Sequence, residues 1–181
     1  MNRKINIKEM TKVSLCVALI CISAYIVIPL PFTPIMITGQ TIAINLTALI
    51  LNPIHSAACI AIFIFLGVSG LPVFAGGNSG LGTLFGPTGG FIIGFLFAVT
   101  AIGYFKGEKI SLFRYLLVTV FIGMPIIYLS GVLYMGYILN ITYIKAMRLA
   151  VIPFLAGDLI KAVPASIIAV RLNNYLTSFT C

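Results

Sequence analysis

Apolar residues form six long runs along the chain, and short segments rich in glycine, proline or polar residues separate them. A helix needs about 20 apolar residues to cross a hydrocarbon core of about 30 Å. Helical spans are therefore expected at residues 11–29, 37–51, 54–70, 89–105, 115–138 and 149–171. The second span is short, and Asn52 and Pro53 separate it from the third, because proline disfavours helical backbone at the residue before it. The pattern predicts an all-α integral membrane protein with six transmembrane helices in a single domain, residues 1–181.

Composition supports a membrane protein and excludes an ordinary water-soluble domain. Hydrophobic residues make up 61% of the chain and charged residues 8%, whereas soluble domains average about 45–50% and 25%. The first apolar run resembles a secretory signal because Arg3 and Lys4 precede it, but no convincing small-residue cleavage site follows. We therefore expect this run to remain in the protein as the first transmembrane helix.

Positive charge is distributed unevenly between the two sides of the expected topology. The formal net charge is +8, yet the basic residues form neither a basic helix nor an aromatic RNA-binding motif, so nucleic acid is not an expected partner. Only Lys145 and Arg148 fall on one side. The other side receives eight basic residues: Arg3, Lys4, Lys8, Lys12, Lys106, Lys109, Arg114 and Arg171. Because basic loops stay in the cytoplasm, both termini are expected there.

Two loops on the opposite, extracellular side carry no charge, at residues 29–40 and 70–90. Ten of the 17 glycines lie between residues 67 and 94, and three prolines stiffen the first loop. Irregular backbone near a membrane needs protein or a water-filled cavity to satisfy its polar groups. We expect ordered extracellular loops 1 and 3 that cover a ligand chamber; two simple surface turns are the alternative.

Asp158 and Lys161 are ionisable residues within an otherwise apolar span. Such groups are unfavourable in a membrane, by about 2.5–3.5 kcal/mol each on insertion scales, and they need partners. Their spacing of three places both on one face of a helix, so a purely structural ion pair is one interpretation. The other is a ligand site, in which Asp158 accepts hydrogen bonds from ligand N–H groups and Lys161 contacts a ligand carboxylate. Both interpretations hold if the two residues pair only before the ligand binds.

Uncharged polar residues near the lids add candidate ligand contacts. Gln40, Thr41 and Asn45 begin the second span, and Asn78 lies in the glycine-rich loop. Amides both donate and accept hydrogen bonds, as a ureido ring also does, so one amide and a carboxylate together would complement such a ring. Packing hydrogen bonds between helices are the alternative role of each amide. Phe91 beside the lid is placed to form part of an apolar wall.

Motifs of enzymes and of metal sites are missing from the sequence. There is no G-x-x-x-x-G-K-[ST] phosphate loop, no Gly-x-Ser-x-Gly elbow and no cluster of acidic residues with histidine. The four cysteines lack C-x-x-C spacing, and His55 is the only histidine, so no metal site is expected. The sequence predicts a ligand-binding protein that is not an enzyme and needs no cofactor.

Three motifs follow one another along the chain: PFTPIMITGQT at residues 31–41, GLPVFAGG at residues 70–77 continuing to GPTGG at residues 86–90, and GDLIK at residues 157–161. Together they resemble the BioY family, the biotin-specific substrate-capture (S) components of energy-coupling-factor (ECF) transporters. The resemblance implies a six-helix fold with a biotin site near the outer face, under the first and third loops. It implies that Asp158, Lys161, Gly76 and Gly77 are among the ligand contacts.

The resemblance also implies a location in a prokaryotic-type cell (plasma) membrane. It implies partners: biotin as the transported ligand, membrane lipids, a transmembrane T component and two ATP-binding cassette ATPases that supply ATP hydrolysis. S components dock the T component through small residues on the first helix, commonly as Ala-xxx-Ala. Ser14 and Ala18 match that spacing here, and small side chains let helices approach closely. Two alternatives remain open: an S component for another vitamin, and a non-transport membrane protein in which Asp158 and Lys161 form only a structural pair.

Overall fold

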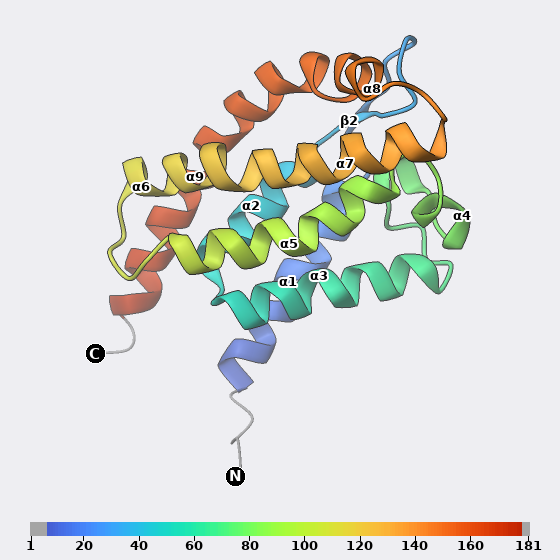
Figure 1. Ribbon diagram of the computed structural model, residues 1–181. Helices are drawn as coiled ribbons and strands as arrows, with labels where there is room; N and C mark the ends of the chain where they lie inside the picture. Colours follow the sequence, from blue (N-terminus) through green and yellow to red (C-terminus); the bar gives the residue numbers. More distant parts are fainter. Residues whose placement is uncertain (1–6, 179–181) are drawn as a thin grey trace.

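The computed structural model describes residues 7–178, most of which are helical (Figure 1). Arg3, Lys4 and Cys181 lie outside the described residues. The helices are α1 (Ile7–Ser23), α2 (Gln40–Ile50), α3 (Pro53–Val68), α4 (Leu81–Leu84), α5 (Gly89–Phe105), α6 (Leu112–Val118), α7 (Met124–Ile138), α8 (Tyr143–Ala150) and α9 (Ile152–Ser178). Shorter elements are the strands β1 (Val27–Ile28) and β2 (Ile37–Thr38), the 3₁₀ turn η1 (Ala75–Gly77) and the π-helical turn η2 (Thr119–Gly123). The predicted helical class is confirmed.

Two of the helices are long and apolar enough to cross a membrane, Leu112–Ile138 and Ile152–Ser178, each of 27 residues. The first comprises α6, η2 and α7, which the π-helical turn joins into one helix. The apolar helices α2, α3 and α5 are shorter, at 11, 16 and 17 residues. The length and composition of these two helices support a helical membrane protein.

The first helix ends earlier than the sequence pattern predicts, at Ser23 and not at residue 29. Val27 and Ile28 instead pair with Thr38 and Ile37 in a two-stranded antiparallel sheet. Proline at position 29 disfavours helical backbone at Ile28, and β-branched residues favour the extended conformation. This hairpin gives the first loop an ordered base.

Helix α8 has no counterpart among the expected spans, and the range 149–171 overlaps its end. Ala146 and Ala150 are buried one turn apart, whereas Lys145 and Arg148 are exposed. A short helix with one buried face and one charged face is amphipathic and belongs at a surface. Helix α9 then begins at Ile152 and continues to Ser178.

Glycines allow α5 and α7 to pack side by side (Figure 1). A β-carbon at Gly90 would overlap Tyr134, and one at Gly94 would overlap Ser130. Small residues at such positions let helix backbones approach closely, which is how membrane helices gain packing contacts. Because both α5 and α7 contribute wall residues to the main cavity, this close contact fixes one side of the site.

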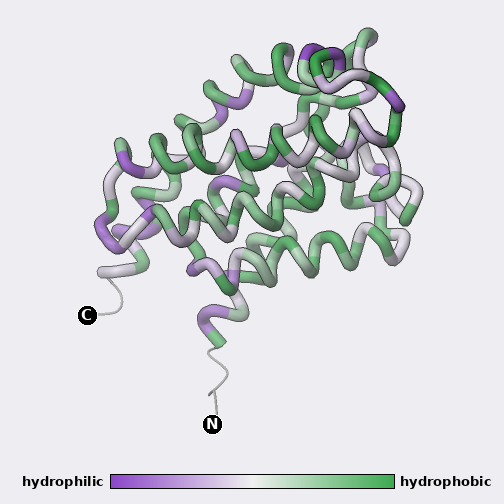
Figure 2. Tube along the Cα trace, viewed as in Figure 1, coloured by the Kyte–Doolittle hydropathy of each residue, from purple (hydrophilic) through white to green (hydrophobic). Residues whose placement is uncertain are grey.

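Hydrophilic residues lie mainly at the two ends of the helix bundle (Figure 2). We call the end formed by the β1–β2 hairpin, η1, α4 and α8 the loop end. The opposite end, where α1 begins and α9 ends, is the terminal end. Apolar residues dominate the helices between them, and many large apolar side chains are exposed, including Ile22, Phe65, Phe97, Phe121 and Ile160.

Candidate ligand-binding site

The main cavity lies at the loop end, between α2, α5, α7 and α9 and beneath the two irregular loops. The free space in the cavity and its mouth, open solvent included, is about 780 Å³. The lining residues are Pro34, Ile35, Met36, Thr38, Gln40, Thr41, Phe74, Ala75, Asn78, Thr83, Thr88, Phe91, Ile92, Phe95, Ile127, Tyr128, Ala150, Phe154, Asp158 and Lys161.

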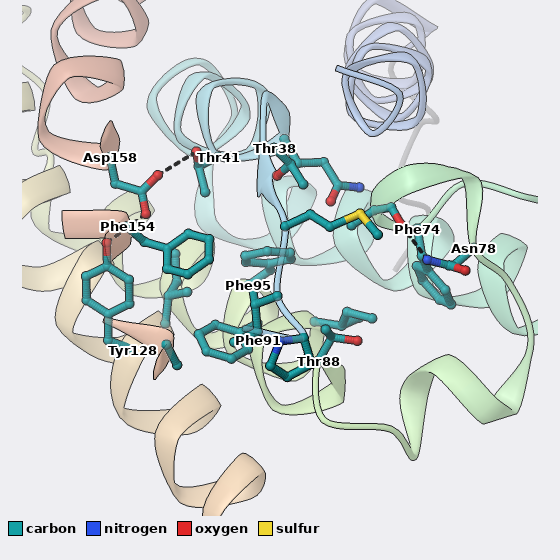
Figure 3. A pocket seen from close by; sticks show the side chains of 18 of the residues that line it. Thr38, Thr41, Phe74, Asn78, Thr88, Phe91, Phe95, Tyr128, Phe154 and Asp158 are labelled. Atoms are coloured by element: carbon teal, nitrogen blue, oxygen red, sulfur yellow. Dashed lines mark hydrogen bonds between the residues drawn. The ribbon is translucent and has the colours of Figure 1, made fainter. Parts of the chain in front are cut away.

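Asp158 forms the charged end of this cavity (Figure 3). Its residue is 7% exposed, and its carboxylate accepts three hydrogen bonds. Thr41 Oγ1 donates to Oδ1 at 3.1 Å, Lys161 Nζ to Oδ1 at 3.0 Å and the Tyr128 hydroxyl to Oδ2 at 2.7 Å. A carboxylate has about four acceptor positions, so one remains for a ligand donor.

Lys161 lies beside Asp158 because residues three apart on a helix are neighbours on one face. The expected ion pair is therefore present, at 3.0 Å. Lys161 Nζ also donates to the Thr38 carbonyl of β2 at 2.8 Å, which ties α9 to the first loop. An ammonium has three N–H donors, and in the described part of the chain two of them have partners. The third is left for a molecule in the cavity.

Aromatic side chains separate this charged end from the opposite side of the chamber. Figure 3 shows Phe91, Phe95 and Phe154 between Asp158 on one side and Asn78 on the other. Phe74 is 1% exposed and packs edge-to-face on Phe63, with ring centroids 5.5 Å apart and an interplanar angle of 80°. Edge-to-face packing orients both rings, so this wall has a fixed shape.

Six of the expected ligand-site residues line the cavity together: Asp158, Lys161, Gln40, Thr41, Asn78 and Phe91. Gln40 also holds the third loop, because its amide donates to the Val73 carbonyl at 3.2 Å. The Asn78 amide donates to the Ala75 carbonyl at 2.7 Å, which closes the turn around η1. The structure thus brings residues from α2, the third loop, α5 and α9 to one chamber.

The other three expected contacts, Gly76, Gly77 and Asn45, do not line the main cavity. Gly76 and Gly77 have φ values of +72° and +76°, which glycine adopts most readily, and the Gly76 N–H donates to the Ala24 carbonyl at 3.0 Å. They shape the loop and join it to the end of α1. Asn45, one turn below Thr41, lines a smaller adjoining cavity with Tyr128 and Asp158.

Tyr128 is a site residue that the sequence did not identify. Its hydroxyl donates to Asp158 from α7, across the chamber from α2. A buried tyrosine hydroxyl usually needs a hydrogen-bond partner, and this was the only local signal for it in an apolar run. Thr83, Thr88 and Phe154 were also missed, because only the folded chain brings their segments to the cavity.

Ser14 and Ala18 lie on the exposed face of α1 and do not line this chamber. The buried residues of that helix, Val13, Val17 and Ile20, face the core. Ser14 Oγ donates to the Met10 carbonyl within the helix at 3.0 Å, so it presents little polarity to its surroundings. Among residues 7–178, no three side chains of His, Cys, Asp or Glu gather into a group able to hold a metal ion.

Comparisons with known proteins place the chain among transport proteins. The biotin transporter BioY of Thermotoga maritima is 36% identical over 167 residues, covering 92% of this chain and 96% of that protein. The probable biotin transporter BioY of Pyrococcus horikoshii is 38% identical over 167 residues, covering 92% and 97%.

A solved structure and a family model agree with these relatives. The crystal structure of the S component for biotin from an ECF-type ABC transporter matches with a TM-score of 0.87 and 28% identity, over 96% of this chain and 95% of that one. The model of the BioY family matches residues 1–178. The chain belongs to the BioY family.

Proposed function

We propose that this protein captures biotin at the outer face of a prokaryotic cell membrane, as the S component of an ECF transporter. The observation that carries the proposal is the loop-end cavity, in which one ion pair, with its carboxylate buried, faces an aromatic chamber. The names of the relatives and of the solved structure, which specify biotin, favour it over another vitamin. Binding would leave the ligand chemically unchanged.

Asp158 and Lys161 lie too close together to receive opposite ends of one ligand. Lys161 Nζ is 3.0 Å from Asp158 Oδ1, so a ligand carboxylate at Lys161 would lie near a second carboxylate in a mostly apolar chamber. Like charges at such a site are mutually unfavourable. A ureido ring is neutral and carries N–H donors next to a carbonyl acceptor.

The ureido ring of biotin therefore binds at this pair, with an N–H toward Asp158 and its carbonyl toward Lys161. This division of roles differs from the sequence expectation that Lys161 contacts the ligand acid. The bicyclic ring packs among Phe91, Phe95 and Phe154, and the acid-bearing tail extends to the side of the chamber where Asn78 lies. Neutral donors such as the Asn78 amide suit the ligand carboxylate there, because this carboxylate remains close to water.

In the membrane, six helical segments cross the bilayer as one substrate-binding domain: α1, α2, α3, α5, the α6–α7 helix and α9. The exposed apolar side chains along the bundle support this arrangement, because soluble proteins rarely expose so much apolar surface. The loop end faces outward and both termini face the cytoplasm. Loops 1 and 3 act as lids. Tyr25, in the segment that leads from α1 to loop 1, donates to the Pro72 carbonyl of loop 3 at 2.6 Å, which supports the two loops moving as a unit.

A T component and two ATPases complete the transporter, and α1 provides the docking face through Ser14 and Ala18. Their exposure opposite the core leaves room for a partner helix. Ala18→Leu should reduce biotin uptake by the complete transporter while biotin affinity of the isolated chain stays unchanged. Loss of binding in the isolated variant would contradict this assignment.

Equilibrium binding of labelled biotin to the purified protein tests the proposed function directly. Unlabelled biotin should displace the label, whereas excess thiamin or riboflavin should not. Displacement by thiamin or riboflavin at concentrations similar to biotin would redirect the proposal to another vitamin. Absence of any saturable biotin binding by a folded sample would refute it.

A further inference from the structure

The loop end exposes positive charge without any exposed negative charge to balance it. The sequence has three acidic residues, Glu9, Glu108 and Asp158. Glu9 pairs with Lys12 in the first turns of α1, and Glu108 lines a cleft at the terminal end. Asp158 is buried. The exposed charged side chains of the loop end are therefore the two basic residues of α8.

Those two residues, Lys145 and Arg148, have no structural partner that explains them. Among residues 7–178, neither side chain forms an ion pair or a hydrogen bond. They lie three apart on one helix, so their charges are neighbours. Two adjacent like charges repel each other, which is unfavourable for α8 itself. Arg148 lies in the last turn of α8, where the helix dipole favours a positive charge, but Lys145 lies earlier in the helix, so the dipole accounts for only one of the two charges.

Helix α8 also leads directly to the chamber. Its last residue, Ala150, lines the cavity, and Arg148 precedes it by two positions. Residues two apart lie on nearly opposite faces of a helix, so exposed Arg148 points away from the wall that Ala150 forms. Its charge therefore reaches the space in front of the cavity only through its field, which extends further at low salt, because the Debye length is about 8 Å at physiological ionic strength and about 30 Å at 0.01 M.

We propose that Lys145 and Arg148 attract small carboxylate anions to the cavity and accelerate their association. The inference rests on the proposed function, because it takes the ligand to be a monocarboxylate whose acid end stays near the mouth. The pair acts before binding, through its field, and not as a ligand contact. It should therefore change the association rate constant and leave the dissociation rate constant unchanged.

A lipid role is the competing explanation, since α8 also exposes Tyr143, Ile144 and Met147. Apolar and basic side chains on one short helix are typical of an element at the membrane interface, where basic residues contact lipid phosphates. In that case removal of the charges would alter the protein only in membranes with anionic lipid. The choice of membrane can separate the two explanations.

The experiment measures biotin association by surface plasmon resonance on the full-length protein in phosphatidylcholine nanodiscs. The variant is Lys145→Gln with Arg148→Gln. At an ionic strength of about 10 mM the association rate constant should fall about three- to tenfold. At about 0.5 M salt the difference from the unaltered protein should vanish. Biotin amide, which is neutral, should associate equally fast with both proteins.

A matched control removes two exposed positive charges from the terminal end, Lys109→Gln with Arg171→Gln. It has the same net charge as the test variant and should associate with biotin at the original rate. A charge-reversed variant, Lys145→Glu with Arg148→Glu, should associate more slowly still.

Three results would overturn the proposal: an unchanged association rate, equal slowing for biotin amide, or slowing that occurs only in nanodiscs with anionic lipid. Failure of the proposed function would look different, because the unaltered protein would then not bind biotin at any salt concentration.

Discussion

Each end of the bundle has one half-buried lysine that hydrogen-bonds to backbone carbonyls, and the two differ in what they leave unused. Lys161 at the loop end donates to the Thr38 carbonyl and to Asp158. Lys106, directly after the last residue of α5, donates to the carbonyls of Ala48, Leu49 and Leu51 at 3.0, 2.8 and 2.5 Å. Residue type and burial are alike at the two positions.

The count of free donors separates a structural lysine from a candidate ligand-binding lysine. Lys106 uses all three N–H groups on the C-terminal end of α2, where the helix dipole favours a positive charge. Within the described residues no carboxylate pairs with it, and burial lowers its pKa to about 8. Lys161 keeps one N–H free and lines the chamber. A buried charge therefore indicates a ligand site only when part of its hydrogen-bonding capacity is unused.

The largest effect that would test this comparison is expected for Lys161→Ala set against Lys106→Ala. Loss of the Lys161 ammonium removes a donor to the ligand and leaves Asp158 without its counter-charge. A loss of about 3 kcal/mol, within the about 2–5 kcal/mol range for charged desolvated contacts, should raise the biotin dissociation constant about a hundredfold or more. Isothermal titration calorimetry of both variants should show nearly unchanged affinity for Lys106→Ala.

Biotin amide identifies which end of the ligand Lys161 contacts. If the ureido ring lies at the ion pair, Lys161→Ala should weaken biotin and biotin amide by similar factors. Selective weakening of biotin would instead place the ligand carboxylate at Lys161. Lys161→Gln keeps two N–H donors and should recover part of the affinity, which shows that a poorly binding Ala variant is not simply misfolded.

The second prediction concerns Asp158, which pairs with Lys161, whereas no carboxylate among the described residues pairs with Lys106. Asp158→Asn keeps the shape but replaces a charged acceptor by an amide whose N–H groups oppose donors from Thr41, Tyr128 and the ligand. Biotin affinity should fall at least about thirtyfold, corresponding to about 2 kcal/mol or more. Desthiobiotin keeps the ureido ring and should weaken by a similar factor. Unchanged biotin affinity in a folded variant would remove Asp158 from the site.

The sequence predicted the ion pair because its signal is local. Two charges three positions apart in an apolar run must share one helix face, whatever the rest of the fold does. The bounds of α5 are likewise those expected, because the helix begins at Gly89 and Gly90 and continues through a long apolar run up to Lys106.

The sequence did not predict the site residue Tyr128, the helix α8 or the structural role of Lys106. All three depend on contacts between segments that are distant in the sequence, and no local pattern contains such contacts. The Tyr128 hydroxyl reaches Asp158 from another helix, and Lys106 reaches carbonyls that any sequence would have. Gly76 and Gly77 were expected at the ligand, yet their positive φ values explain their presence through the loop alone. Glycine motifs indicate special backbone, and only the fold tells whether a ligand lies beside it.

The third prediction uses Lys106 to test the structural side of the comparison. Lys106→Ala removes one donor from each of three carbonyls at the end of α2. Asn173 still donates to the Leu49 carbonyl and Ser56 to the Leu51 carbonyl, so the loss falls mainly on Ala48. An unsatisfied buried polar group costs about 1–3 kcal/mol. The apparent unfolding temperature in detergent should fall by several degrees, at about 2–4 °C per kcal/mol for a chain of this size. Exposed Lys109→Ala should leave it unchanged. A large loss of biotin affinity in Lys106→Ala would show that the two ends are coupled.

Among the variants at or beside the chamber, the smallest effects on affinity are expected from two glycines, Gly67 and Gly157. A β-carbon at Gly67 would overlap the ring of Phe74, and Phe74 both lines the chamber and packs on Phe63. Gly67→Ala should therefore displace one wall and weaken biotin about three- to tenfold, a loss of about 1 kcal/mol that is typical of modest overpacking.

Gly157 is the matched control because it neighbours Asp158 in sequence yet does not line the main cavity. A β-carbon there would meet no described atom within 4 Å beyond the adjacent turns of its own helix. Gly157→Ala should leave biotin affinity unchanged and raise thermal stability slightly, since alanine is favoured over glycine in helices by about 0.5–1 kcal/mol. Titration calorimetry and thermal unfolding of both variants measure these effects. Weakened binding in Gly157→Ala would mean that the ligand approaches α9 from the side of Gly157, and the chamber described here would then not be the complete site.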